Sequence, residues 1–423
     1  MKKKFISSIA LLTMAVVSCT ENIVPTEVVK PEVKLENRDL EEIIQIAQNA
    51  PSLFEGEDGT RGTRNAKKEI DLSSITGITN KDITRTSSAV DTLLYVMNYA
   101  DNNGYVIVSS KQGTPGVIAY IEEGQYDLEE INNNQTNIGY VTDLATTHIN
   151  NTERIYDRIP FPGSDTVTFR INPLIQTKWG QRGVEGTYCP NGVSGCVNTA
   201  IAQICAYYEY PDTIQLTYKN ADKPYQVLDW NDIKKHKILH QKMQPIDFPI
   251  CPASTESHNA IGRLCRQLGE LTNSTYSSDE YGTGTEDDDI VPTAEYLGFT
   301  CKPWVSYTDS CTIAPLQSLH PLLVSGFAIG LIGHVWIIDG YLDMRITTTE
   351  YLVDQQTITT EERFIYNHVN WGWDGKDNGY IYGSIFNPSN MYSKDPSIHG
   401  DSGYDLNFEF GLYTLEMYRH NPN

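Results

Sequence analysis

The chain has 423 residues, and its 54 acidic against 32 basic side chains give a formal net charge of −22. Residues 1–165 carry 15 basic and 24 acidic residues, a net charge of −9, and the rest carries 17 and 30, a net charge of −13, so the acidity is spread along the chain. This argues against a nucleic-acid binder, which needs a basic face for phosphates, and against a polybasic membrane-surface protein. The length predicts two or three domains.

The first nineteen residues are typical of an export signal. Three lysines at positions 2–4 precede an apolar run at 5–17, which is shorter than the ~20 residues that a membrane-spanning helix needs. Val16-Val17-Ser18-Cys19 then resembles a bacterial lipoprotein signal. We expect a signal peptide over residues 1–18 and a membrane anchor on lipidated Cys19, which places the protein in the bacterial cell envelope, at the outer membrane or cell surface. A plain signal peptide with an incidental cysteine is the alternative.

A tether and a small α+β module are predicted next. Residues 20–37 have the composition of a tether, and residues 40–47 place apolar side chains at helical spacing, with Pro51 expected to close that helix. Strand patterns follow at 92–99, 104–108 and 116–121, with a hairpin signal at 101–104.

A change of composition marks a domain boundary between residues 150 and 172. All six tryptophans lie after this region, as does every cysteine except Cys19. Pro160, Pro162 and Gly163 inside it are typical of a connecting segment.

Cys196 is placed where a nucleophilic cysteine is expected. Residues 195–208 carry apolar side chains at helical spacing, Ser194 is the predicted N-cap, and Pro211 ends the pattern. Cys196 then lies in the first turn, where backbone N–H groups and the helix dipole stabilise a thiolate. A buried structural cysteine is the alternative, and the functional interpretation requires a base.

His334 and Asn370 are the candidates for that base and its partner. Two strand patterns at 333–341 and 364–373 flank a polar stretch at 342–363. If the strands pair as a long hairpin, His334 and Asn370 fall at the same open end, where the imidazole could take the proton of Cys196 and Asn370 could orient it. His368, two residues from Asn370, is the rival.

Gln181 is a candidate oxyanion donor. It lies fifteen residues before Cys196, and a side-chain amide beside the N–H of the nucleophile is the donor pair that an oxyanion hole uses. A surface glutamine is the alternative.

The remaining cysteines and one acidic run are weaker features. If Cys19 is lipidated and Cys196 is catalytic, six cysteines remain (189, 205, 251, 265, 301 and 311), which allows three disulfides in 15 pairings or, alternatively, buried apolar thiols. Residues 286–289 could bind calcium, with a solvated acidic loop as the alternative. No zinc, nucleotide or serine-hydrolase motif is present, so no cofactor and no metal is predicted.

Five blocks of sequence, in one order, together resemble the streptopain family of secreted papain-like cysteine peptidases. They are Pro173-Leu174-Ile175-Gln176-Thr177-Lys178-Trp179-Gly180-Gln181, Tyr188-Cys189-Pro190, Gly195-Cys196-Val197-x-Thr199-Ala200-x-Ala202-Gln203-Ile204, Gly333-His334-x-Trp336-x-Ile338-Asp339-Gly340-Tyr341 and Asn370-Trp371-Gly372-Trp373. The likeness covers residues 171–423 well, and the N-terminal strands are more loosely similar to the propeptide of the family.

The resemblance implies a role for each matching residue. Cys196 corresponds to the nucleophile, His334 to the general base and Gln181 to the oxyanion-hole residue, while Asn370 and Trp371 belong to the block beside the catalytic histidine. His368 then has a structural or substrate-rim role. Asn198 departs from the family, which has a small residue there, and we expect its side chain on the solvent or cleft side of the helix.

The expected protein is therefore a lipid-anchored zymogen of α+β class with the papain-like cysteine peptidase fold. We assign residues 1–18 to the signal peptide, 19–165 to the tether and an α+β pro-domain that blocks the cleft, and 166–423 to the peptidase. Its expected partners are protein or peptide substrates, its own pro-domain and, through Cys19, a membrane. An inactive surface protein that binds peptides is the alternative, and an enzyme that transfers acyl groups to amines is a third interpretation.

Overall fold

The computed structural model describes residues 36–55, 68–79, 91–127, 137–151, 166–236, 253–277, 282–327, 333–351, 357–387 and 412–419. The expected export signal, Cys19 and most of the tether lie outside these residues, as does Cys251. None of the helices in the described ranges has the length and apolar character needed to cross a membrane.

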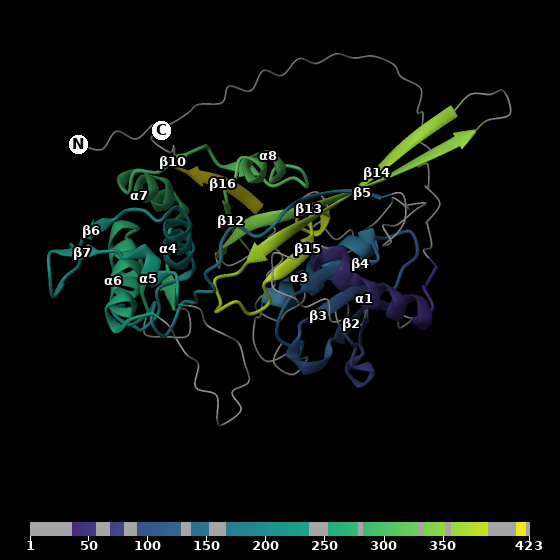
Figure 1. Ribbon diagram of the computed structural model, residues 1–423, viewed down its shortest axis with the longest axis horizontal. Helices are drawn as coiled ribbons and strands as arrows, with labels where there is room; N and C mark the ends of the chain where they lie inside the picture. Colours follow the sequence, from purple (N-terminus) through teal and green to yellow (C-terminus); the bar gives the residue numbers. More distant parts are fainter. Residues whose placement is uncertain are drawn as a thin grey trace, which may run out of the picture. The chain divides into compact units, whose positions relative to one another are not determined.

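One antiparallel sheet organises the molecule (Figure 1). Its strands lie in the order β1 (Thr76–Thr79), β2 (Thr92–Asn98), β3 (Tyr105–Ser109), β4 (Val117–Ile121), β15 (Gly379–Tyr382), β14 (Thr357–Asn370), β13 (Gly333–Tyr351), β12 (Leu322–Phe327), β16 (Leu412–Tyr418) and β10 (Thr300–Cys301). β5 (Thr166–Ile171) also pairs with β13, and β11 (Val305–Ser306) pairs with β16. The three strands predicted in the N-terminal module are confirmed, and they join the C-terminal strands in a single sheet through β4 and β15.

The first helix is longer than predicted. α1 (Leu40–Glu55) continues through Pro51, which was expected to end it. The added turn is held by burial, because the Phe54 ring stacks on Tyr120 at 5.1 Å and meets Tyr366 edge-on at 5.0 Å. Packing of the last turn therefore outweighs the hydrogen bond that a proline removes from a helix.

Short helical elements complete the N-terminal part. They are η1 (Leu72–Ser74), η2 (Ala100–Asn102) in the predicted hairpin turn, and α3 (Asn137–Asn151), which the sequence patterns did not predict. α3 packs on η4 (Gly383–Phe386) of the C-terminal part.

A layer of helices covers one face of the C-terminal strands. It contains α4 (Cys196–Tyr208), α5 (Trp230–Ile233), α6 (Thr255–Leu271), η3 (Asp287–Asp289) and α7 (Ile290–Tyr296), with two small hairpins, β6 (Thr213–Gln215) with β7 (Tyr225–Val227) and β8 (Thr275–Tyr276) with β9 (Thr283–Gly284). α8 (Ile313–Gln317) packs on the opposite face, because its Leu316 belongs to the core that contains Trp336 and Ile338. The predicted helix at 195–208 is confirmed as α4, which packs on α6 and β13.

Alternate residues of β13 face two separate cores. Val335 and Ile337 are buried with the helices, whereas Trp336 and Ile338 are buried with the aromatic cluster on the opposite face of the sheet. This is the period of two that strand geometry imposes. The helical half and the antiparallel sheet half confirm the predicted α+β class.

The predicted hairpin of β13 and β14 is confirmed, with two corrections. The polar stretch at 342–363 is mostly strand, since β13 extends to Tyr351 and β14 begins at Thr357. Asp343 accepts hydrogen bonds from Arg363 at 2.7 Å and Arg345 at 2.9 Å, which explains how charged residues are accommodated there. Asn370 lies opposite Ile337, so His334 extends three residues beyond it, past the end of β14.

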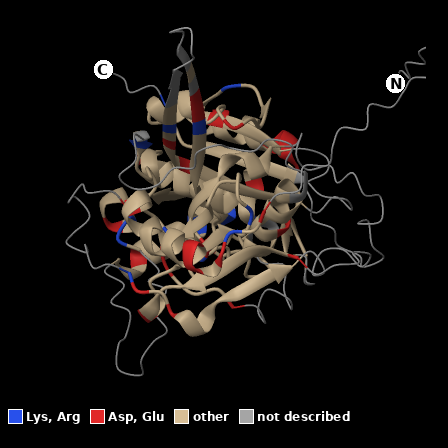
Figure 2. Cartoon of the chain, turned by 90° about the vertical axis from the view of Figure 1, so that its right-hand side faces the viewer, with Lys and Arg blue, Asp and Glu red and all other residues tan. Residues whose placement is uncertain are grey.

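Charged residues follow the distribution expected from the sequence. Figure 2 shows Asp and Glu residues scattered over the described elements, with Lys and Arg residues among them. No broad basic face is visible in that view, in keeping with the net charge of −22.

Candidate active site

Cys196 is the first residue of α4, as predicted, but the N-cap is Gly195 rather than Ser194. Gly195 has φ 89°, and a Cβ there would lie 3.1 Å from atoms of Thr283, so both the backbone and the space favour glycine. The Ser194 hydroxyl instead forms a hydrogen bond with Thr199 Oγ1 at 2.8 Å and donates one to the carbonyl of Gln181 at 3.2 Å. The turn is therefore held by bonds to neighbouring segments and not by a side-chain cap.

The thiol of Cys196 lies against β13. Burial raises the pKa of the thiol, while hydrogen bonds from the backbone N–H groups of Val335, Val197 and Cys196 itself act in the opposite direction. The nearby charge of Asp287 adds to the rise. Contact with Val335 places the sulfur beside the residue that follows His334, so the structure brings together the two residues that the sequence analysis singled out as nucleophile and base.

His334 is held among three tryptophans. Its ring lies nearly parallel to the neighbouring indoles of Trp336 and Trp371, at 5.9 and 6.2 Å, and meets Trp373 edge-on at 6.1 Å. Burial lowers the pKa of His334 to about 4, so the imidazole is neutral at neutral pH. A neutral imidazole with one lone pair is the form that can accept a proton.

The carbonyl of Trp371 selects the tautomer of His334. The imidazole Nε2 lies 3.2 Å from that oxygen. A carbonyl only accepts hydrogen bonds, so Nε2 carries the proton and Nδ1 keeps the lone pair. The same residue is fixed in turn, because Trp371 N–H donates to Asn378 Oδ1 and its indole Nε1–H donates to the Asp377 carbonyl, each at 3.0 Å.

The side chain of Asn370 does not bind the imidazole of His334, which the sequence analysis expected it to orient, but forms its hydrogen bonds with other groups. Its Oδ1 accepts from the Gly372 N–H at 3.1 Å, and its Nδ2 donates to the Thr177 carbonyl and to Gln203 Oε1, both at 3.2 Å. The expected direct contact with the imidazole is replaced by the Trp371 carbonyl. Asn370 thus holds the turn that presents this carbonyl.

Gln203 is a site residue that the sequence analysis did not single out. It lies on α4, fully buried, and its Oε1 also accepts from Trp179 N–H at 3.2 Å and from Thr177 Oγ1 at 3.1 Å. One amide therefore ties the helix of the nucleophile to the segment before Gln181 and to Asn370. The available signal was an amide side chain among the apolar residues in the middle of the helix.

Gln181 lies beside the turn that leads to Cys196. Its carbonyl accepts the Ser194 N–H at 2.8 Å, and its side chain is half-buried. The preceding Gly180 is packed against Asp374, since a Cβ on Gly180 would lie only 2.2 Å from Asp374 Oδ1. The chain at 179–181 is thus positioned from both sides, next to Ser194 in the turn that leads to Cys196.

Asn198 does not face the cleft or solvent, which corrects the sequence-based expectation. It is fully buried, donates to the Ser194 carbonyl at 2.8 Å and to Ser274 Oγ at 2.9 Å, and accepts from Thr272 Oγ1 at 2.9 Å. These bonds join the start of α4 to the end of α6, so the residue has a structural role.

His368, the rival base, is turned away from Cys196. Its Nδ1 lies 2.6 Å from Asp339 Oδ1, and it is paired across the sheet with Gly340. The acidic run at 286–289 forms η3, and none of the described His, Cys, Asp and Glu residues form a group that could hold a metal ion.

The six cysteines within the described ranges are all free thiols. They are Cys189, Cys196, Cys205, Cys265, Cys301 and Cys311. The structure therefore gives buried or half-buried thiols at these positions instead of the disulfides that were considered.

Comparison with known proteins adds two family matches. Residues 176–381 match the Peptidase C10 family, and residues 47–138 match the Spi protease inhibitor family. The first match contains all five site residues, and the second runs from within α1 to the start of α3.

Relatives of similar organisation are distant in sequence. Thiol protease/hemagglutinin PrtT of Porphyromonas gingivalis is 22% identical over 81% of this chain and 39% of its own length. Streptopain of Streptococcus pyogenes is 24% identical over 70% of this chain and 75% of its own length. The chain thus spans well under half of the first of these relatives.

A solved structure has the same fold. A fragment of Prevotella intermedia prointerpain A, carrying a cysteine-to-alanine substitution, covers 82% of this chain and all of its own length with a TM-score of 0.50 and 18% identity. An inhibitor-like module thus precedes a domain that presents Cys196 to β13 beside His334, and residues 176–381 form a domain of the Peptidase C10 family that is similar to streptopain.

Proposed function

We propose that the protein is an exported, lipid-anchored cysteine endopeptidase made as a zymogen. The observation that carries the proposal is the joint placement of two side chains. Cys196 begins a buried helix with its thiol against Val335, and the adjacent His334 has its base tautomer fixed by Trp371.

The proposed reaction proceeds through an acyl-enzyme. Cys196 transfers its proton to Nδ1 of His334, and the sulfur attacks the carbonyl carbon of the peptide. The Cys196 N–H and the Gln181 side-chain amide stabilise the oxyanion. The imidazolium then protonates the leaving amine, and water hydrolyses the thioester with His334 as base, which releases the acid and restores the thiol.

Both reacting groups are uncharged in the structure described. Burial raises the pKa of Cys196 and lowers the pKa of His334 to about 4, so a thiolate–imidazolium pair is disfavoured. This state fits a precursor that is not yet active. We propose that maturation changes the surroundings of this pair.

We place the maturation site between α3 and β5. α3 ends at Asn151 and packs on η4, while β5 begins at Thr166 and is paired with β13. A cut in residues 152–165 would leave β5 in the peptidase. It would separate the tether and the pro-domain through α3 from a peptidase that begins at or before Thr166.

The lipid anchor rests on the sequence of residues 1–19 alone. Growth with a labelled fatty acid tests it, since the parent chain should incorporate label and Cys19→Ala should not. Label in both chains, or in neither, would remove the anchor from the proposal without affecting the peptidase.

The first experiment is mass spectrometry of residues 20–423 beside Cys196→Ala after incubation in reductant. Loss of about 130–155 residues in the parent alone would establish a self-processing peptidase. If both chains stay whole and an epoxide inhibitor fails to label Cys196, the protein is a binder of the same fold. Equal cleavage of both chains would point to a contaminating protease.

An added amine distinguishes hydrolysis from acyl transfer, because only a transferase would incorporate the amine into the product.

A further inference from the structure

The pro-domain docks on the peptidase as an added strand. β4 pairs with β15, with Ala119 opposite Ile381, Tyr120 opposite Tyr380 and Ile121 opposite Gly379. A Cβ on Gly379 would lie 2.2 Å from the Tyr120 carbonyl, so glycine permits the close approach. Strand addition of this kind uses main-chain hydrogen bonds for affinity and side chains for specificity.

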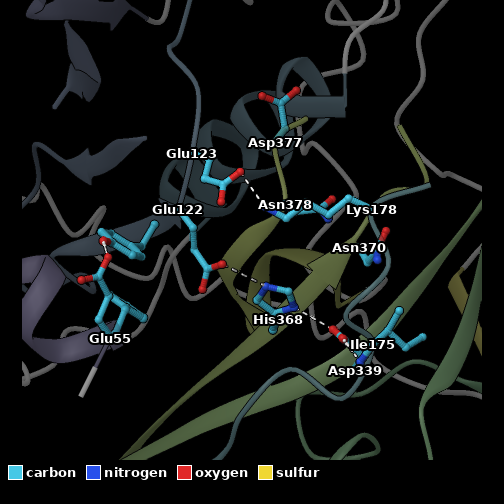
Figure 3. Close-up of polar contacts among 12 residues, drawn as sticks. Glu55, Glu122, Glu123, Ile175, Lys178, Asp339, His368, Asn370, Asp377 and Asn378 are labelled. Carbon is cyan, nitrogen blue, oxygen red and sulfur yellow. Dashed lines mark hydrogen bonds and ion pairs between the residues drawn. The ribbon is translucent and has the colours of Figure 1, made fainter. Parts of the chain in front are cut away.

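Two carboxylates follow directly after β4 and meet two cationic groups of the peptidase (Figure 3). Glu123 forms an ion pair with Lys178 at 2.5 Å, and a carboxylate oxygen of Glu122 lies 3.9 Å from Nε2 of His368. We call β15, His368 and Lys178 together the cationic strand edge. Its charge is complementary to the acidic end of β4.

His368 lies between carboxylates of the two parts. Asp339 of β13 is bound to Nδ1 at 2.6 Å, Glu122 faces Nε2, and the Tyr380 ring of β15 meets the imidazole edge-on at 5.1 Å. Asp339 is itself fixed, because its second oxygen accepts the Ile175 N–H at 2.9 Å. Within this surrounding, Nε2 is buried and has Glu122 as its charged neighbour.

The surroundings of His368 favour its protonated, positively charged form. Burial acts against the charged imidazole, but Asp339 and then Glu122 outweigh it and raise the pKa of His368 to about 9. Asp339 belongs to the peptidase and stays with it, whereas Glu122 belongs to the pro-domain. The pro-domain therefore supplies part of the stabilisation of the imidazolium.

We propose that the cationic strand edge is a docking site for an extended acidic segment, that residues 117–123 are its ligand, and that protonated His368 holds them. This inference rests on the proposed zymogen, in which the pro-domain must bind and later leave. The occupant is the chain's own β4 with the two glutamates that follow it, and the peptidase recognises it by one backbone edge and two positive charges.

Docking is consequently linked to pH. Without Glu122, the pKa of His368 falls below its docked value, so docking takes up protons in the window between the two values. The contribution of Glu122 is fully present below the lower pKa and is lost as the pH rises through about 9. Alkaline conditions therefore loosen the pro-domain.

The test uses the full chain with Cys196→Ala, which needs no activity. Glu122→Gln removes the charge that faces His368, and Glu123→Gln is the matched control, since it affects Lys178 instead. Labelled histidine and NMR give the pKa of His368. We expect a lower pKa in Glu122→Gln and an unchanged one in Glu123→Gln.

Hydrogen exchange of β15 amides reports docking in the same samples. At pH 7 we expect protection to fall about fivefold in Glu122→Gln, the scale of one partly exposed ion pair. The difference from the parent should vanish above pH 9. Equal pKa values and equal protection in parent and Glu122→Gln would overturn the proposal.

The result of the docking experiment can be distinguished from the result of the test for self-processing. Mass spectrometry of the parent reports self-processing, and the exchange experiment reports docking in an inactive chain. An unprocessed parent with a weakened Glu122→Gln interface would remove the peptidase but keep the docking site. A processed parent with an unaffected interface would do the reverse.

Discussion

The Nε2 atom of His334 lies 3.2 Å from the carbonyl oxygen of Trp371, and this contact leaves Nδ1 as the basic nitrogen of the imidazole. A backbone carbonyl cannot rotate away from the strand end that carries it. The position of this carbonyl depends on Asn370, whose Oδ1 accepts the N–H of Gly372. Asn370 in turn donates to Gln203, which belongs to the helix that begins at Cys196. The nucleophile and the orientation of its base are therefore set by one connected network.

Loss of the base should abolish most activity without unfolding the protein. We expect His334→Ala to lower kcat by about 10³-fold, within the range for removal of a general base. The matched control is His320→Gln, whose ring stacks on Tyr418 at the C-terminal strand. Turnover of a peptide substrate by mature enzyme measures both, and similar kcat values for the two variants would contradict the assignment of His334.

The sequence was sufficient to find the helix of Cys196 and the hairpin that brings His334 to it, because both follow from periodicity along short segments. The role of Asn370 could not be read in the same way. It depends on a register shift between Ile338 and Gly340 and on Gln203, 167 residues away. A local pattern contains no information about which of two nearby acceptors a buried imidazole will meet.

The pairing that joins the N-terminal and C-terminal strands in one sheet could also not be predicted from the sequence. β4 and β15 are each ordinary short strands, and their pairing depends on a close approach at Gly379 between segments more than 250 residues apart. The predicted cap of α4 was wrong for a related reason, because the Ser194 hydroxyl bonds the Thr199 side chain and the Gln181 carbonyl rather than a free backbone N–H at the start of the helix. Such competition between partners is decided by tertiary structure.

The amide of Gln203 should be important for stability as well as for the site. Gln203→Leu leaves the Trp179 N–H and the Asn370 amide without this acceptor, at a cost of about 1–3 kcal/mol for each buried group left unpaired. Urea unfolding of the Cys196→Ala chain measures the loss. Gln215→Leu on the exposed side of β6 is the control, and an equal effect of the two changes would show that the network contributes little.

Gly180 and Asp374 should behave as a coupled pair. Gly180→Ala places a Cβ 2.2 Å from Asp374 Oδ1, and we expect overpacking to destabilise the fold by about 1–3 kcal/mol. Asp374→Gly removes the obstructing carboxylate and suits the φ of 56° at that position.

The double variant should therefore recover most of the loss, both in unfolding free energy and in kcat/KM. Gly284→Ala serves as the control, because a Cβ there meets no atom within 4 Å. Additive effects of Gly180→Ala and Asp374→Gly would show that the carboxylate does not limit the space beside the segment that precedes Gln181.

The buried imidazole of His334 should make the fold sensitive to acid. Its pKa is about 4 in the native state and about 6.5 in an unfolded chain, so the unfolded state binds more protons between these values and stability falls as the pH decreases from 6.5 toward 4. The loss from this group reaches on the order of 3 kcal/mol at pH 4.

Asp374 acts in the opposite direction, because its pKa is raised to about 6 by burial and by Glu185, and its protonated form favours the native state. Urea unfolding at pH 4.5 and 7 separates the two: His334→Gln in the Cys196→Ala chain should flatten the dependence on pH, whereas Asp374→Asn should steepen it. An unchanged slope in His334→Gln would mean that the imidazole is solvated in the native protein.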